Sequence, residues 1–151
     1  MTLKPLRWMG SWTWRRSQKS WSFLLLPALL LPDLAGAQQR ETVTPQFNHA
    51  LPNAPGKSLI AVTVDYPPGA KSGPHTHAKS AFIYGYVVSG AIRSQVDDAP
   101  AKIYRAGEAF YEMPGAHHKI SENASDSEPA RLLAVFVVDS NDTPLTAPDS
   151  H

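Results

Sequence analysis

The chain has 151 residues, with 14 basic side chains, 13 acidic side chains and no cysteine. At 42% hydrophobic content it is long enough for one domain with its own core and too short for two of ordinary size. The lack of cysteine excludes disulfides, thiolate metal ligands, a cysteine nucleophile and a lipid-modified cysteine.

Residues 1–37 are predicted to be a cleaved secretory signal peptide. They begin with five Lys and Arg residues, continue through an apolar run over 23–31 and end in Ala35-Gly36-Ala37, a small-residue cleavage site. An uncleaved anchor is the alternative, but Pro27 interrupts a run that is shorter than the roughly 20 residues a bilayer needs. We therefore expect a periplasmic or secreted protein with no membrane span after cleavage. Arg15-Arg16 leaves the twin-arginine route open beside the general one.

Cleavage would also change the charge of the protein. It would leave nine basic and twelve acidic side chains, a net charge of −3. A mildly acidic domain without a basic stripe has no electrostatic reason to bind nucleic acid, so no nucleic-acid partner is expected.

The remaining chain is predicted to be all-β. Residues 38–57 form an irregular or edge-forming arm, and residues 58–139 contain short apolar runs separated by turn residues, without a helical period. The tail over 140–151, rich in small polar residues and proline, is expected to be loosely held. The expected strands cover 59–66, 82–88, 92–96, 102–105, 109–113, 118–121 and 132–138. Many short strands at this spacing are typical of a β-sandwich or barrel.

Two histidine clusters are the candidate metal ligands. His75 and His77 are two positions apart, so on an extended strand both side chains point to the same side. His117 and His118 are adjacent, so at most one of them can join that pair. Neutral imidazoles that converge from separate strands are a common transition-metal site.

These clusters and their flanking glycines resemble the two motifs of the cupin superfamily over residues 58–138. The matching residues are Gly69, His75, His77 and Gly90 in the first motif, and Gly107, Gly115 and His118 in the second. The resemblance implies a single cupin-type jelly-roll β-barrel over 58–139, with His118 rather than His117 as the third ligand. It also implies a possible homodimer.

The first motif departs from the family pattern at its metal-binding glutamate. None of the twelve residues between His77 and Gly90 is acidic, and Ala81, Phe82 or Ile83 takes the glutamate's place. Three imidazoles without a carboxylate leave the +2 charge on the ion and two or three positions for water or a chelating anion. The set resembles cupin dioxygenases that use Fe²⁺, with Mn, Ni, Cu or Zn as other candidate ions.

Two functions follow as hypotheses. The first is a metal-dependent dioxygenase that acts on a small chelating anionic substrate, and the second is a non-catalytic module that binds or senses a small molecule. The missing glutamate favours the second hypothesis. Tyr84, Tyr86 and Phe110 are candidates to line a substrate pocket, against the alternative that they pack in the core and at the rim.

Overall fold

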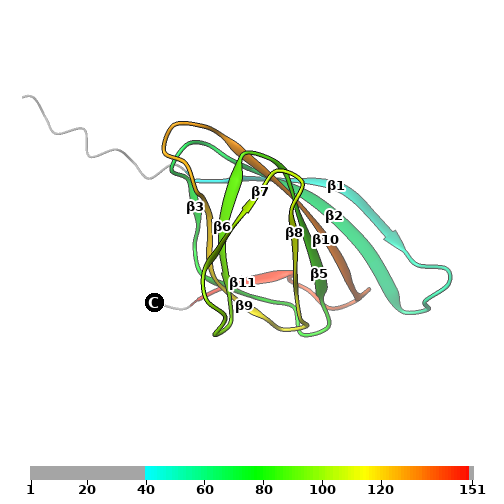
Figure 1. Ribbon diagram of the computed structural model, residues 1–151. Coiled ribbons are helices and arrows are strands. Elements are labelled where there is room, and N and C mark those ends of the chain that lie inside the picture. The colour runs from blue at the N-terminus through cyan, green and yellow to red at the C-terminus, as the bar shows by residue number, and fades with distance from the viewer. Residues whose placement is uncertain (1–39, 150–151) are drawn as a thin grey trace, which may run out of the picture. The chain divides into compact units, whose positions relative to one another are not determined.

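The computed structural model describes residues 40–149, which form two antiparallel β-sheets that face each other (Figure 1). The first sheet contains, in spatial order, β1 (Thr42–Ala50), β2 (Lys57–Tyr66), β10 (Ala130–Asp139), β5 (Phe82–Ser89) and β8 (Ala109–Glu112). The second contains β11 (Thr146–Pro148), β4 (His75–His77), β9 (His117–Asn123), β6 (Ala91–Val96) and β7 (Lys102–Arg105), with β3 (Lys71–Ser72) paired to β9. The predicted signal peptide lies outside the described residues. No segment of residues 40–149 is a helix with the length and hydropathy of a membrane span.

The chain passes repeatedly from one sheet to the other. β4 and β9 belong to the second sheet, whereas β5, β8 and β10 belong to the first, so most connections after β4 cross between sheets. The strands form a two-sheet jelly roll rather than one continuous closed sheet, which confirms the all-β jelly-roll prediction. Strands that are distant in sequence therefore lie beside each other, as β2 and β10 do along their full length.

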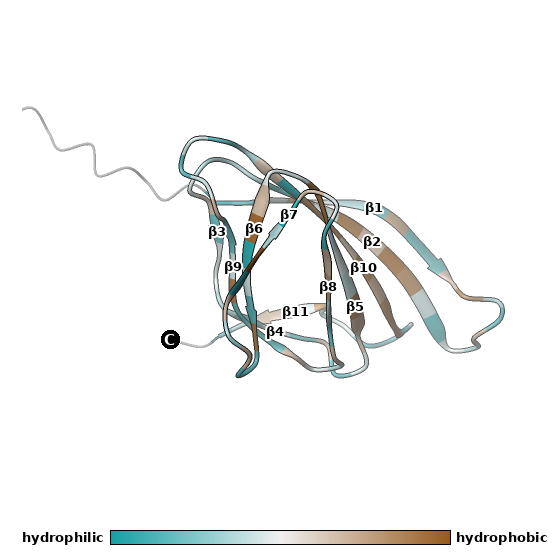
Figure 2. Cartoon of the chain, in the orientation of Figure 1, coloured by the Kyte–Doolittle hydropathy of each residue, from teal (hydrophilic) through white to brown (hydrophobic). Residues whose placement is uncertain are grey.

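The core lies between the two sheets and follows the alternation of the strands. On β2, Val62, Val64 and Tyr66 face inward, and on β10 the buried positions also alternate. Figure 2 shows the hydrophobic residues gathered on β2, β5 and β10. Each of the seven strands expected from sequence is present, with ends shifted by at most two residues. Burial of alternate apolar side chains is the main stabilising contribution to such a sandwich.

Two strands lie at the ends of the described chain, where the sequence suggested an irregular or edge-forming arm and a loosely held tail. The arm contains β1, an edge strand that pairs with β2 and is exposed at all nine positions. The tail contains β11, which pairs with β4 so that Thr146 lies opposite His77 and Pro148 opposite His75. The tail therefore lies directly beside the histidine-bearing strand, although its composition suggested a loosely held segment.

Candidate metal centre

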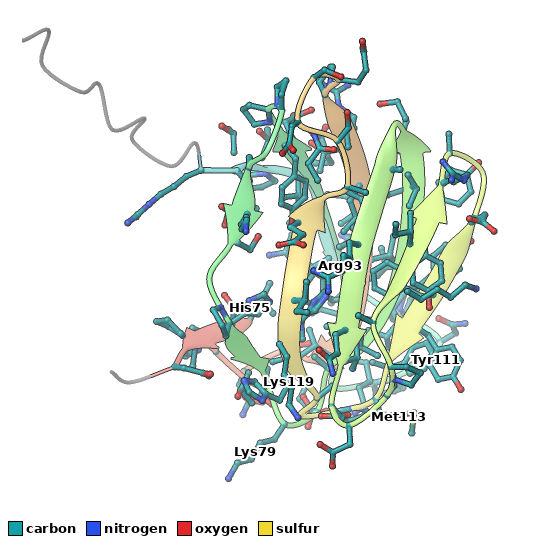
Figure 3. The ribbon with its side chains drawn as sticks, turned by 60° about the vertical axis from the view of Figure 1, so that its left-hand side comes forward. His75, Lys79, Arg93, Tyr111, Met113 and Lys119 are labelled. Atoms are coloured by element: carbon teal, nitrogen blue, oxygen red, sulfur yellow. The ribbon has the colours of Figure 1, made fainter. Side chains whose placement is uncertain are left out.

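The structure brings the three predicted ligands together. β4 and β9 are paired so that His75 lies directly opposite His118, and His77 is two positions further on the same face. One nitrogen from each ring lies within 4.8 Å of the others. His77 and His118 are buried and His75 is half-buried. Figure 3 shows His75 on β4, with β9 on one side of this strand and β11 on the other.

The neighbouring His117 points away from this cluster. It is paired with Thr76, and its Nε2 atom lies 2.8 Å from Oδ2 of Asp149, just beyond β11. This outward orientation is the one expected from strand alternation, which allows one histidine of the adjacent pair to face the interior. The contact between His117 and Asp149 helps to hold the C-terminal strand against β4.

Hydrogen bonds orient two of the three imidazole rings. Nδ1 of His75 lies 2.8 Å from the carbonyl oxygen of Gly73, so Nδ1 carries the proton and Nε2 is available as a ligand. Nε2 of His118 lies 2.9 Å from Oγ of Ser94, which leaves Nδ1 directed toward the cluster. Burial lowers the pKa of His75, and the neighbouring His77 and His118 lower it further. His75 is therefore held in the neutral form that binds metal ions.

Glu112 lies in the same cluster, although the sequence analysis did not include it. Its Oε2 atom is 3.0 Å from Nε2 of His77, and its Oε1 atom is 3.3 Å from Nδ1 of His118. The side chain is only 4% exposed. Burial raises the pKa of Glu112, but the interactions of its carboxylate with His118 and His77 outweigh this effect and lower it to about 2. The carboxylate is therefore ionised at neutral pH.

One sequence signal could have indicated that Glu112 faces the interior. β8 alternates between exposed and buried residues, with Phe110 and Glu112 buried and Tyr111 exposed. A glutamate two positions from a buried phenylalanine on a strand faces the interior. Such a residue requires a polar partner or an ion.

A cavity of about 980 Å³ lies between the sheets, and the cluster forms part of its wall. Its apolar wall comes mainly from the inner face of the first sheet and includes Val62, Val64, Ile83, Leu132, Ala134 and Phe136. Two exposed basic residues, Arg40 and Lys71, also line it. A second polar group in the wall is Tyr66, whose hydroxyl lies 2.9 Å from Oγ of Ser72 and 2.8 Å from Oγ of Ser121.

The predicted pocket residues Tyr84, Tyr86 and Phe110 are not among the residues that line the cavity beside the histidines, although Phe110 lines a second hollow. Tyr84 is 45% exposed and Tyr86 is half-buried, because both occupy the outward face of β5 while Ile83 faces the cavity. The inward position between the two tyrosines is Gly85, where a Cβ atom would lie 2.7 Å from Phe110. Phe110 does face inward, but it packs behind the cluster, with its ring centre 6.1 Å from that of His118.

Comparisons with known proteins agree with this fold. The family model described as a cupin domain matches residues 62–136. No match to a curated protein was found. The chain belongs to the cupin superfamily.

Several solved structures are similar to the chain. A double-stranded β-helix protein from Klebsiella pneumoniae is 17% identical, with a TM-score of 0.57 over 78% of this chain and 89% of that one. The cupin domain of Cnp3 from Schizosaccharomyces pombe is 21% identical, with a TM-score of 0.53 over 66% and 62%. A recombinant oxalate oxidase in complex with glycolate is 22% identical, with a TM-score of 0.54 over 72% and 54%. At these identities the likeness establishes the fold.

Proposed function

We propose that this cupin holds one divalent transition-metal ion on His75, His77 and His118 and uses it to act on a small chelating anion. The proposed activity is that of a dioxygenase-type oxidoreductase, with Fe²⁺ as the first candidate ion. The observation that carries the proposal is a set of three converging imidazoles in the wall of a cavity large enough for a small molecule.

The donor atoms of the cluster fit such an ion. Buried polar atoms in proteins nearly always have a hydrogen-bond partner. Both ring nitrogens of His77 and Oε2 of Glu112 are buried and have no hydrogen-bond partner among the described residues. A metal ion between the rings would supply a partner to the nitrogen that faces it. Imidazole and carboxylate donors suit Fe²⁺, and also Mn²⁺, Ni²⁺, Cu²⁺ and Zn²⁺.

A bound Fe²⁺ ion would supply a Lewis acid and a redox-active centre. The protein's own residues would select and place the substrate. Lys71 and Arg40 would attract an anionic group, although Lys71 also lies 3.5 Å from Glu122. Leu132 and Phe136 would contact the non-polar part of the molecule and exclude water. The similar oxalate oxidase, whose structure contains glycolate, is consistent with a small carboxylate as ligand.

The non-catalytic alternative loses its main argument when Glu112 is taken into account. That alternative depended on the absence of a carboxylate near the histidines. Glu112 supplies an ionised carboxylate against two of the three rings. The carboxylate whose absence favoured the non-catalytic alternative is therefore present in the cluster, although it comes from another strand.

Oxygen consumption by the iron-loaded protein tests the proposed activity. We expect uptake with at least one member of a panel of diketones, thiols and catechol-like compounds, and we expect His77→Ala to abolish it. The matched control is His117→Ala, which should retain uptake because His117 faces away from the cluster. A protein that binds one iron ion and consumes no oxygen with any member of the panel would support the binding module instead.

Export to the periplasm or the medium is also part of the proposal and depends on residues 1–37. Cell fractionation, followed by N-terminal sequencing of the exported form, should give a mature chain that begins at Gln38. Recovery of the full-length chain from the cytoplasm alone would contradict it.

A further inference from the structure

We propose that Glu112 is a fourth protein ligand of the metal ion, so that this chain supplies the carboxylate missing from its first motif from a neighbouring strand. The inference rests on the proposed function, since it requires that the three histidines bind an ion. It changes the expected centre from three nitrogen donors to three nitrogen donors and one oxygen donor.

Strand pairing explains how a carboxylate on β8 can take the place of the family's glutamate on β5. Ile83 on β5 is one of the three residues at the position where the family pattern has glutamate. In the sheet, Ile83 lies directly opposite Glu112 on β8. Directly paired residues of adjacent strands present their side chains on the same face. Both residues are buried, at 1% and 4% exposure, and both line the cavity. A carboxylate on β8 therefore reaches the same interior space as one on β5.

The distances from Glu112 to two of the rings are compatible with donor atoms that share an ion. Two ligand atoms each about 2.1 Å from one metal ion lie about 3.0 Å apart at octahedral angles and about 3.4 Å apart at tetrahedral angles. The two Glu112 oxygens are 3.0 Å from His77 Nε2 and 3.3 Å from His118 Nδ1. His77 Nε2 and Glu112 Oε2 lie 3.0 Å apart, yet neither has a hydrogen-bond partner among the described residues. An ion bound by both atoms would give each of them a partner.

The charge of the cluster also favours a bound cation. A buried carboxylate is costly unless a positive group or hydrogen bonds compensate it. The ion-pair partners of Glu112 within residues 40–149 are His77 and His118, and neither Lys nor Arg contacts it. Imidazoles are neutral when they bind a metal ion, so in the metal-bound form the rings carry no charge to balance Glu112. A divalent ion supplies that charge, and four protein ligands would leave two positions of a six-coordinate ion for a chelating anion.

Metal affinity of Glu112→Gln is the first test, because glutamine preserves size and removes the charge. Titration with Mn²⁺ and Co²⁺ should show a loss of affinity greater than about 100-fold, beyond the 10–100-fold typical when an outer-shell partner is removed. The matched control is Glu122→Gln, which removes a partly buried carboxylate that pairs with Arg93 on the other face. We expect this control to change affinity by less than about 2-fold.

The crystal structure of the metal-loaded wild-type protein is the second test and needs no variant. We expect a Glu112 oxygen at about 2.0–2.2 Å from the ion. A Glu112 carboxylate that stays more than about 3 Å from the ion and only hydrogen-bonds a histidine ring would overturn the inference. An affinity loss of less than about 10-fold for Glu112→Gln would do the same. A wild-type chain that binds no ion overturns the proposed function as well, so the two failures are distinguishable.

Discussion

Two buried polar groups lie on the wall of the same cavity, and they differ in how their polar atoms are paired. In the first, Tyr66 donates or accepts hydrogen bonds with Ser72 and Ser121 at 2.9 and 2.8 Å. In the second, His77 and Glu112 approach to 3.0 Å, yet both nitrogens of His77 and one oxygen of Glu112 lack hydrogen bonds to any residue of 40–149. The first group therefore has its hydrogen bonds within the described fold, whereas the second has buried polar atoms without a partner there.

This difference in hydrogen bonding distinguishes a group that stabilises the fold from a group suited to binding an ion. A satisfied polar network in a core stabilises and orders the fold. Buried polar atoms without partners cost free energy, and a protein retains them where a ligand or ion satisfies them. We therefore assign stability to the Tyr66 group and metal binding to the histidine cluster. Substitutions in each group should affect one property and spare the other.

Removal of any one histidine of the cluster should have the largest effect. His75→Ala, His77→Ala and His118→Ala should each lower metal affinity by orders of magnitude, because the loss of one imidazole breaks the chelate. His117→Ala is the matched control and should leave affinity nearly unchanged, since its ring faces Asp149. Calorimetric titration with one ion across the four variants measures this. Loss of binding in His117→Ala with retention in His118→Ala would mean that the faces of β9 are exchanged.

Ser94→Ala should have a smaller effect on the same property. Oγ of Ser94 lies 2.9 Å from Nε2 of His118 and fixes the orientation of that ring. Loss of such an outer partner typically costs at least about 10-fold in metal affinity. Ser121→Ala, in the other polar group, should keep the wild-type affinity under the same titration. Equal losses of metal affinity in both variants would indicate that the Tyr66 group and the histidine cluster do not have separate roles.

Tyr66→Phe should affect stability instead. It removes the hydroxyl that bonds Ser72 and Ser121 and leaves the Ser121 hydroxyl buried without that partner. We expect the free energy of unfolding to fall by about 1–3 kcal/mol, with metal affinity unchanged. Tyr84→Phe on the outer face is the control and should change stability by less than about 0.5 kcal/mol. Urea denaturation of the metal-free proteins provides the measurement. A Tyr66→Phe protein of full stability but weakened metal binding would reverse the assignment.

Acid sensitivity of the metal-free protein gives a further expected difference. The pKa of Glu112 falls from 4.5 to about 2 in the folded protein, so below pH 4.5 the unfolded chain takes up the proton first. Its stabilising contribution is complete above pH 4.5 and is lost progressively as the pH falls toward 2. In Glu112→Gln, stability should therefore decline less steeply over this interval. Urea denaturation with chelator present measures the stability of both proteins at each pH. If the stability of the wild-type protein and of Glu112→Gln declines equally steeply as the pH falls, the lowered pKa is contradicted.

Alternation along the strands made most of the fold predictable. Seven strands and the placement of His75 and His77 on one face follow from a period of two residues. The face of β5 did not follow, because Phe82, Ile83 and Tyr84 are all apolar or aromatic and either side could be buried. β11 has only three residues, too few for a periodic signal.

Glu112 was missed because its position depends on strand pairing. It is 29 residues from Ile83 in sequence and directly opposite it in the sheet. The register between β5 and β8 sets that proximity. Two other strands lie between β5 and β8 in the sequence, so the local sequence pattern does not specify this register. A motif search within one strand finds the absence of a glutamate and cannot find its replacement on another.

The central claim is that the cluster binds a divalent ion, and titration of the wild-type protein, purified without a histidine tag, tests it most directly. We expect about one equivalent of Fe²⁺ or Mn²⁺ to bind per chain and to raise the unfolding temperature, since an ion that binds the folded state alone stabilises it. Less than about a tenth of an equivalent, with no thermal stabilisation by Fe, Mn, Ni, Cu or Zn, would contradict the claim.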